Sequence, residues 1–215
     1  MDKKFWQSKW DKNEIRFNQS KPHPLLVKHF DKLSLDKGNR VFLPLCGKTI
    51  DIAWLISNGF YVVGVELVEI AIQQLFNELG IEPQIEQVGE LKLYRAENID
   101  IFVGDFFKVR GKMLKPINAV YDRAALVALP EKKRIKYTKH LVSITKKAPQ
   151  ILITFDYNQE EISGPPFSIN SDEIKMHYGD KYKTDLIESI HSQSSLKKSV
   201  SVAENIWILQ IETNL

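Results

Sequence analysis

The segment from Arg40 to Leu67, RVFLPLCGKTIDIAWLISNGFYVVGVEL, restricts the fold of this chain more than any other part of its sequence. Two short apolar runs, at Val41–Leu45 and Phe60–Val65, stand on either side of a tight loop and a helical pattern. A strand, a helix and a second strand in this order form a βαβ unit, whose two strands lie parallel in one sheet. The sequence therefore predicts an α/β fold with a mostly parallel sheet.

Glu66 follows the second apolar run, at the strand end where open parallel sheets bind their ligands. A carboxylate in this place can accept two hydrogen bonds from a ribose diol. Gly47 precedes it by close to the spacing of roughly 20 residues that is typical of that role. Two interpretations stay open at this point. The segment holds a nucleoside-bearing cofactor, or it is an ordinary βαβ unit with a surface glutamate at a strand end.

The loop between the first strand and the helix is poor in glycine, which narrows the kind of cofactor. A dinucleotide-binding loop needs three glycines to bring backbone amides to a pyrophosphate, and only Gly47 is present here. The tripeptide Gly47-Lys48-Thr49 is similar to the end of a phosphate-binding P-loop, but Phe42 occupies the position of that loop's first glycine. A nucleoside cofactor without phosphates fits best, and we expect S-adenosylmethionine.

The composition is that of a globular protein, with 43% hydrophobic and 27% charged residues in a chain of 215, enough for one domain with a full core. No stretch approaches the roughly 20 apolar residues of a membrane span, and the first residues lack the apolar core of a secretory signal. The single cysteine, Cys46, excludes an internal disulfide and favours a reducing compartment. A net charge of +3 is too small to indicate nucleic acid, and the five histidines are not at metal-ligand spacing.

Two further groups of residues allow two interpretations each. Trp6 and Trp10 are four residues apart, so a helix would place them on one face, with Phe17 near the same side. Spacing alone favours core packing for this stripe over a lid whose aromatic side chains cover a ligand pocket. Gly104 and Asp105 follow another apolar run. Either the Asp105 carboxylate meets an adenine amino group there, or the two residues form a turn without a ligand.

The remaining patterns alternate between helices and strands and end in a strand-rich segment. We expect helices at 25–33, 67–80 and 131–146, and strands at 91–94, 99–103, 117–121, 150–156, 183–195 and 200–211. Gly80 is expected to cap the second of these helices, and Ile135 and Leu141 to point inward from the third. In the helix of the βαβ unit, Ala53 and Trp54 fall on one face.

Six short motifs, taken together and in order, resemble the bacterial-type thiopurine S-methyltransferases. They are FWQSKW at 5–10 with Phe17, FLPLCGK at 42–48, VGVE at 63–66, FVGDFF at 102–107, YDRAALVA at 121–128 and GPPF at 164–167. The resemblance runs nearly end to end. It implies a Rossmann-like class I methyltransferase fold with antiparallel C-terminal strands. It also implies S-adenosylmethionine-dependent transfer of a methyl group to the sulfur of aromatic or heterocyclic thiols such as thiopurines.

The resemblance also implies the roles of individual residues. Those expected at the cofactor are Trp6, Trp10, Leu45, Gly47, Glu66, Gly104, Asp105 and Arg123, and those expected at the methyl acceptor are Phe17, Pro165 and Pro166. Arg123 is expected to be the catalytic residue between cofactor and acceptor, with the adjacent Asp122 only holding it in place. Residues 1–35 become an N-terminal helical lid of a single domain, 1–215, that acts as a monomer on a small-molecule thiol without nucleic acid or membrane.

Two departures from the family pattern bear on the identity of the methyl acceptor. Asn18 stands where the family usually has a histidine, and Lys197 and Lys198 stand near the place of an arginine that faces the acceptor. Lysine lacks the planar fork of donors that arginine offers. The alternatives are a methyltransferase of the same superfamily acting on halide, selenium or tellurium species, a nicotinamide-dependent dehydrogenase, or a non-catalytic binding module.

Overall fold

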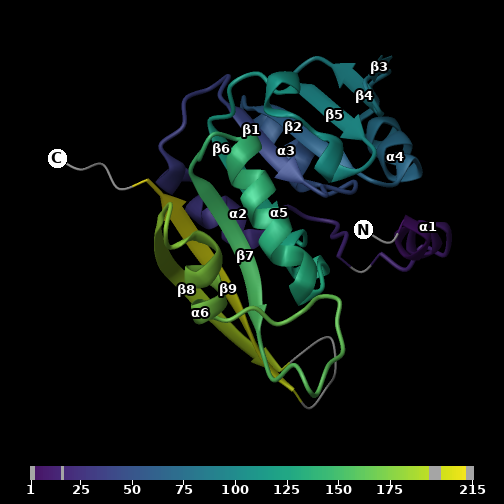
Figure 1. Cartoon of the computed structure of the whole chain (residues 1–215). Helices are drawn as coiled ribbons and strands as arrows, with labels where there is room; N and C mark the ends of the chain where they lie inside the picture. The colour runs from purple at the N-terminus through teal and green to yellow at the C-terminus, as the bar shows by residue number, and fades with distance from the viewer. Residues whose placement is uncertain (1–2, 16, 194–199, 212–215) are drawn as a thin grey trace.

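The computed structural model describes residues 3–15, 17–193 and 200–211. Within these residues nine strands form one sheet, in the order β3-β4-β5-β2-β1-β6-β7-β9-β8 (Figure 1). The strands are β1 (Arg40–Pro44), β2 (Tyr61–Glu66), β3 (Gln84–Val88), β4 (Leu91–Ala96), β5 (Ile99–Val103), β6 (Ala119–Arg123), β7 (Gln150–Asp156), β8 (Lys183–Gln193) and β9 (Ser201–Gln210).

The centre of the sheet is parallel and its two sides are antiparallel. Strands β5, β2, β1, β6 and β7 pair in parallel, whereas β4 and β3 extend one side and β9 and β8 the other in antiparallel pairs. The chain moves from β1 to β2 and β5 on one side, then crosses to β6 and β7 on the other. Such a reversal opens a crevice at the carboxyl ends of the strands around β1, where open sheets bind ligands. The predicted fold class is confirmed.

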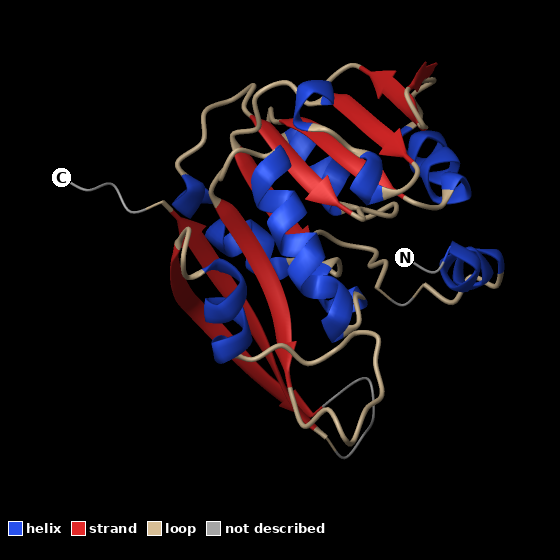
Figure 2. Ribbon diagram, viewed as in Figure 1, coloured by secondary structure: helices blue, strands red, loops and turns tan. Residues whose placement is uncertain are grey.

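Helices cover both faces of this sheet (Figure 2). They are α1 (Lys3–Asp11), α2 (Pro24–His29), α3 (Asp51–Ser57), α4 (Glu69–Leu79), α5 (Glu131–Ile144) and α6 (Ser171–Tyr178), with short 3-10 helices η1 (Phe30–Leu33), η2 (Phe106–Lys108), η3 (Gly111–Met113) and η4 (Leu126–Ala128). Among the described helices, none combines the length and the apolar character that a bilayer crossing requires.

Two hydrophobic cores lie on opposite faces of the sheet, because successive side chains of a strand alternate in direction. Phe42 of β1 packs in the core that contains Tyr137 and Leu141 of α5. Its neighbour Leu43 packs in the core that contains Leu55 of α3. The central strands β1 and β2 therefore read as nearly continuous apolar runs, as expected where a sheet is covered on both sides.

The structure agrees with several expected elements and corrects others. Strand β7 occupies residues 150–156 as predicted, and Gly80 caps α4 with a left-handed φ of 67°. Ile135, predicted to point inward, is 47% exposed, because α5 turns Tyr137 and Leu141 toward the sheet instead. Strand β3 and helix α6 were not expected, and β3 is exposed along most of its length, so that its sequence lacks an apolar alternation. Residues 194 and 195 of the predicted strand 183–195 lie outside the described residues.

Candidate functional site

The loop after β1 folds back onto the end of β2 and forms one wall of the candidate site. Leu45 and Gly47 both have positive φ, 48° and 52°, a conformation that glycine adopts without strain. The backbone N–H of Cys46 donates to the Val65 carbonyl oxygen over 3.0 Å, and that of Gly47 donates to Glu66 Oε2 over 2.9 Å. The last residues of β2 therefore hold this loop in place.

The Glu66 carboxylate is buried at the tip of β2 and joins two segments. Its Oε2 accepts from Gly47, and its Oε1 accepts from the backbone N–H of Val68, just before α4, over 2.9 Å. Burial raises the pKa of Glu66, whereas the backbone donors of Val68 and Gly47 act to lower it. Each carboxylate oxygen has two lone pairs, so Glu66 retains the capacity to accept hydrogen bonds from a diol.

Aromatic side chains of the N-terminal segment lie over Gly47. Trp10 of α1 is 5% exposed, and a Cβ placed on Gly47 would lie 3.2 Å from Trp10 Cζ2 and 3.8 Å from Phe17 Cε2. The ring centroids of Trp10 and Trp6 lie 5.8 Å and 6.0 Å from that of Phe17, in edge-to-face contacts. Glycine therefore suits position 47, because a side chain there would be strained by the positive φ and its Cβ would press against the Trp10 ring.

Phe17 reaches this cluster in a way that helical spacing does not explain. Helix α1 ends at Asp11, so the chain has turned before it reaches Phe17. Trp10 and Phe17 pack with Leu67 and Val68, which follow β2 directly. The cluster is separate from the two large cores of the sheet, and it covers the carboxyl end of β2.

Gly104 and Asp105 follow β5 next to the same strand end. The backbone N–H of Gly104 donates to the Glu66 carbonyl oxygen over 2.8 Å, and a Cβ on Gly104 would lie 2.6 Å from Leu91 Cδ2. Asp105 Oδ1 accepts from the N–H of Phe107 over 3.0 Å and so caps η2. Asp105 thus has a local structural role at the strand end, close in the fold to the acid of β2.

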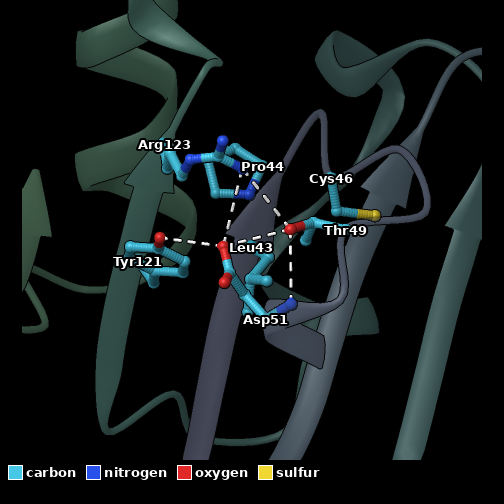
Figure 3. A pocket seen from close by; sticks show the side chains of 7 residues that line it. All are labelled: Leu43, Pro44, Cys46, Thr49, Asp51, Tyr121 and Arg123. Atoms are coloured by element: carbon cyan, nitrogen blue, oxygen red, sulfur yellow. Dashed lines mark hydrogen bonds and ion pairs between the residues drawn. The ribbon is translucent and has the colours of Figure 1, made fainter. Parts of the chain in front are cut away.

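Arg123, the last residue of β6, faces a small pocket beside the loop after β1 (Figure 3). The pocket is lined by Leu43, Pro44, Cys46, Thr49, Asp51, Tyr121 and Arg123. Arg123 Nη2 donates to the Phe17 carbonyl oxygen over 3.0 Å, and Nη1 lies 3.5 Å from Thr49 Oγ1 and 3.6 Å from Asp51 Oδ2. The guanidinium therefore connects β6 with the N-terminal segment and with the start of α3.

Asp122 does not hold Arg123 in place, so this prediction was wrong. Successive side chains of a strand point to opposite faces, and Asp122 faces the core under α5. There it accepts from the Tyr137 hydroxyl over 2.6 Å and from the Leu126 N–H over 3.1 Å. The acid beside Arg123 is instead Asp51, which sequence reasoning missed. The sequence did carry one signal for Asp51, because it is an acid in the first turn of the predicted helix, one turn before the buried Leu55.

The surroundings of Asp122 lead to a prediction about stability and pH. Burial raises the pKa of Asp122 from 3.8 to about 6, although hydrogen bonds from Tyr137 and Leu126 oppose the shift. The folded protein thus holds this proton more tightly than the unfolded chain does. Asp122 therefore stabilises the fold most below about pH 4 and loses up to about 3 kcal/mol of that contribution as the pH rises through about 6.

Urea unfolding of wild type and Asp122→Asn at about pH 4.5 and 7.5 measures this effect. We expect the free energy of unfolding of the wild type to fall, relative to that of the variant, as the pH rises. Equal pH dependence of the two proteins would contradict the assignment of a raised pKa to Asp122.

The loop between β7 and α6 carries Pro165 and Pro166. The N–H of Phe167 donates to the Val127 carbonyl oxygen over 2.7 Å, which ties the loop to η4, the segment that follows Arg123. In the described part of the chain, neither proline lines the pocket around Arg123. The structure thus brings this loop to the region beyond β6 but does not bring its prolines into that pocket.

The other predicted site residues fall into one connected region. Contacts or hydrogen bonds link Trp6, Trp10, Phe17, Gly47, Glu66, Gly104 and Arg123. Asp105 follows Gly104 directly, and Leu45 lies two residues before Gly47 in the same loop. Asn18 Oδ1 is buried and has no hydrogen-bond partner among the described residues. Lys197 and Lys198 lie outside the described residues.

Comparisons with known proteins agree with this geometry. A model of the thiopurine S-methyltransferase family matches residues 1–211. A thiopurine S-methyltransferase of Xanthobacter autotrophicus is 43% identical over 211 residues, or 98% of this chain and 99% of the relative. One of Teredinibacter turnerae is 44% identical over 214 residues, or 100% of both chains. A solved 1,6-didemethyltoxoflavin-N1-methyltransferase of Burkholderia thailandensis, with bound S-adenosylhomocysteine, has a TM-score of 0.63 at 12% identity and covers 96% of this chain and 86% of its own.

The sheet order and the likeness to solved S-adenosylmethionine-dependent methyltransferases define a class I methyltransferase fold. Within that class, the chain belongs to the thiopurine S-methyltransferase family. It is therefore a methyltransferase, and S-adenosylmethionine is its methyl donor. The site fits that donor, because Glu66 has spare acceptor capacity for a ribose diol and the loop offers one glycine instead of a pyrophosphate cradle.

Proposed function

We propose that this enzyme transfers the methyl group of S-adenosylmethionine to the sulfur of aromatic or heterocyclic thiols such as thiopurines. The observation that carries the proposal is the chain of contacts that joins Glu66, at the end of β2, to Arg123, at the end of β6. The buried Glu66 carboxylate holds Gly47, Trp10 and Phe17 cover Gly47, and Arg123 donates to the Phe17 carbonyl oxygen. The names of the relatives support a thiol as the acceptor.

In this proposal the two ribose hydroxyls donate to Glu66, as the acceptor capacity of its carboxylate allows. Leu45 and Gly47 lie along the methionine and ribose, Gly104 and Asp105 border the adenine, and Trp6 and Trp10 close over the donor. These tryptophans belong to a lid, residues 1–35, of a single domain. Phe17 and the Pro165–Pro166 loop border the acceptor, a placement supported by the hydrogen bond from Arg123 to Phe17 and by the anchoring of the loop to η4.

When bound, the donor supplies a methyl group on a positively charged sulfur, ready for in-line displacement by a thiol sulfur. The chain itself has to align the acceptor, exclude water and control charge. Trp10 and Phe17 exclude water above Gly47, because their rings are in contact with each other and with the loop. A thiol is acidic enough that a strong general base is optional.

Arg123 acts on the acceptor sulfur in this proposal. Its side chain is 12% exposed, and an enclosed guanidinium donates strong hydrogen bonds to an anion. It therefore stabilises the thiolate that forms when the acceptor loses its proton to solvent before methyl transfer. Cys46 is assigned no role in this proposal, since burial raises the pKa of its thiol well above the ordinary value and so disfavours the thiolate.

The lid leads to a prediction for Trp10. Replacing Trp10 with alanine is expected to weaken S-adenosylhomocysteine binding by about 10-fold, because the aromatic cover over Gly47 is lost and the site opens to water. Titration calorimetry measures the Kd. Trp54→Ala is the matched control, since Trp54 of α3 packs against Phe30 of η1, and it should change Kd by less than about 2-fold. An unchanged Kd for Trp10→Ala would contradict the lid.

The proposed activity is tested with labelled S-adenosylmethionine and a panel of thiols, thiopurines, halides, and selenium and tellurium oxyanions. Methylation of thiols or thiopurines above the other acceptors is the expected result, and preference for one of the other groups would overturn it.

S-adenosylhomocysteine should raise the melting temperature of the protein, because a ligand stabilises the state that binds it. A rise with NADH alone would favour a dehydrogenase, and a rise with neither ligand would favour a non-catalytic module.

We further propose that the enzyme acts as a cytoplasmic monomer on a small-molecule thiol. The buried single cysteine, Cys46, suits a reducing compartment. Light scattering of the purified protein distinguishes a monomer from a larger assembly.

A further inference from the structure

We propose that Asp51 is a positioning residue for methyl transfer, which fixes the Arg123 guanidinium and, through it, the backbone at Phe17. This inference rests on the proposed function, in which Arg123 meets the acceptor sulfur. Asp51 acts through Arg123 and is assigned no contact with donor or acceptor.

The Asp51 carboxylate is held by donors from three parts of the fold. Asp51 lies in the first turn of α3 and is 1% exposed. Its Oδ2 accepts from the hydroxyls of Tyr121 and Thr49 over 2.9 Å and 3.0 Å, and its Oδ1 accepts from the backbone N–H of His23 over 2.7 Å. Figure 3 shows the carboxylate between Tyr121, Thr49 and Arg123. Because these donors come from β6, from the loop after β1 and from the N-cap of α2, the carboxylate keeps its orientation without help from Arg123.

Arg123 is then held on two sides. Its Nη1 lies 3.6 Å from Asp51 Oδ2, and its Nη2 donates to the Phe17 carbonyl oxygen. The buried charges of Asp51 and Arg123 stabilise each other, because an unpaired buried charge is strongly destabilising. A fixed anion beside a long, flexible side chain limits where the guanidinium can lie. Such limits matter because a displacement of about 1 Å in a reacting site can cost about 100-fold in rate.

The same pair of residues also holds both ends of the segment 17–23. Asp51 accepts from His23, the N-cap of α2, and Arg123 donates to Phe17. Phe17 in turn packs against Trp10 above Gly47. One buried carboxylate therefore sets the place of the cation and, through it, the edge of the aromatic cover.

A double-mutant cycle tests whether Asp51 acts through Arg123. We compare kcat/KM for a thiopurine acceptor in wild type, Asp51→Asn, Arg123→Ala and the double variant, at saturating S-adenosylmethionine. Asp51→Asn alone is expected to lower kcat/KM by about 10- to 100-fold, and by less than about 2-fold when Arg123 is already alanine. A residue with a merely structural role would lower kcat/KM by the same factor in both backgrounds, and that result would overturn the proposal.

Two further variants complete the experiment. Tyr121→Phe removes one donor to Asp51 without changing shape, and it is expected to lower kcat/KM by about 3- to 10-fold in the wild-type background only. It provides the same test if Asp51→Asn does not fold.

Asp122→Asn is the matched control, because Asp122 is an equally buried acid on the opposite face of β6. It should change kcat/KM by less than about 2-fold, whatever it does to stability. A loss with Asp122→Asn equal to that of Asp51→Asn would overturn the proposal.

The cycle separates failure of this inference from failure of the proposed function. If Arg123→Ala keeps the wild-type kcat/KM, the role of Arg123 is wrong and the role of Asp51 falls with it. If Arg123→Ala loses activity but Asp51→Asn keeps it, or loses it equally in both backgrounds, only the role of Asp51 is wrong.

Discussion

Replacing Glu66 with alanine is expected to raise the apparent KM for S-adenosylmethionine by about 10- to 100-fold, because hydrogen bonds to a charged group contribute about 1.5–3 kcal/mol. The substitution removes the carboxylate proposed to meet the ribose, and it also removes the acceptor of Gly47 and Val68. Turnover at saturating donor should fall by a smaller factor, since Arg123 lies on another strand. Steady-state kinetics with varied donor measures both quantities.

Two variants separate the ribose contact from general damage to the fold. Glu66→Gln keeps the shape of the side chain but has one acceptor oxygen, so its KM should lie between those of wild type and Glu66→Ala. Asp100→Asn is the control, because Asp100 is a buried acid near the amino end of β5, where it pairs with Arg40 and Arg95. Its KM for the donor should change by less than about 2-fold. An unchanged KM for Glu66→Ala would show that the ribose binds elsewhere.

The other large effect is expected at Arg123, whose replacement by alanine should lower kcat/KM for a thiol acceptor by about 100-fold. Removal of one preorganised donor to a developing anion has a cost of this order. The pH at which the rate rises should also increase, because the variant no longer favours the thiolate. The pH profile of kcat/KM, measured with an acceptor whose thiol pKa in solution is known, gives both effects.

Arg123→Lys keeps the charge but loses the fork of donors, so it should recover part of the rate. Arg40→Ala is a matched control, since the Arg40 side chain is also 12% exposed and paired with a buried acid, but it lies at the amino end of β1. It should leave both kcat/KM and its pH profile close to those of wild type. Equal losses at Arg40 and Arg123 would indicate a general effect of removing an enclosed arginine.

The sheet could be predicted from the sequence because its central strands are buried on both faces. Residues 150–156 of β7 and the run before Glu66 are mostly apolar segments between turn signals, and such segments can be recognised without any knowledge of the fold. Gly80 was equally readable as a cap, since the αL conformation after a helix favours glycine. Strand β3 lacks such a run, and its pairing with β4 decides its conformation.

Parts of the site depend on contacts between distant segments. Phe17 meets Trp10 because the chain turns after Asp11, and helical spacing does not predict such a turn. Asp51 meets Tyr121 across 70 positions of sequence, through the pairing of β1 with β6. The direction of the Asp122 side chain could have been predicted, because strand alternation places it on the face opposite Arg123.

The central claim is that Glu66 holds the ribose of S-adenosylmethionine at the tip of β2. A crystal structure of the enzyme with S-adenosylhomocysteine tests it most directly. We expect both ribose hydroxyls within hydrogen-bonding distance of the Glu66 carboxylate, with Trp10 covering the ligand. A ribose bound away from Glu66, or a crevice left empty at saturating ligand, would contradict it.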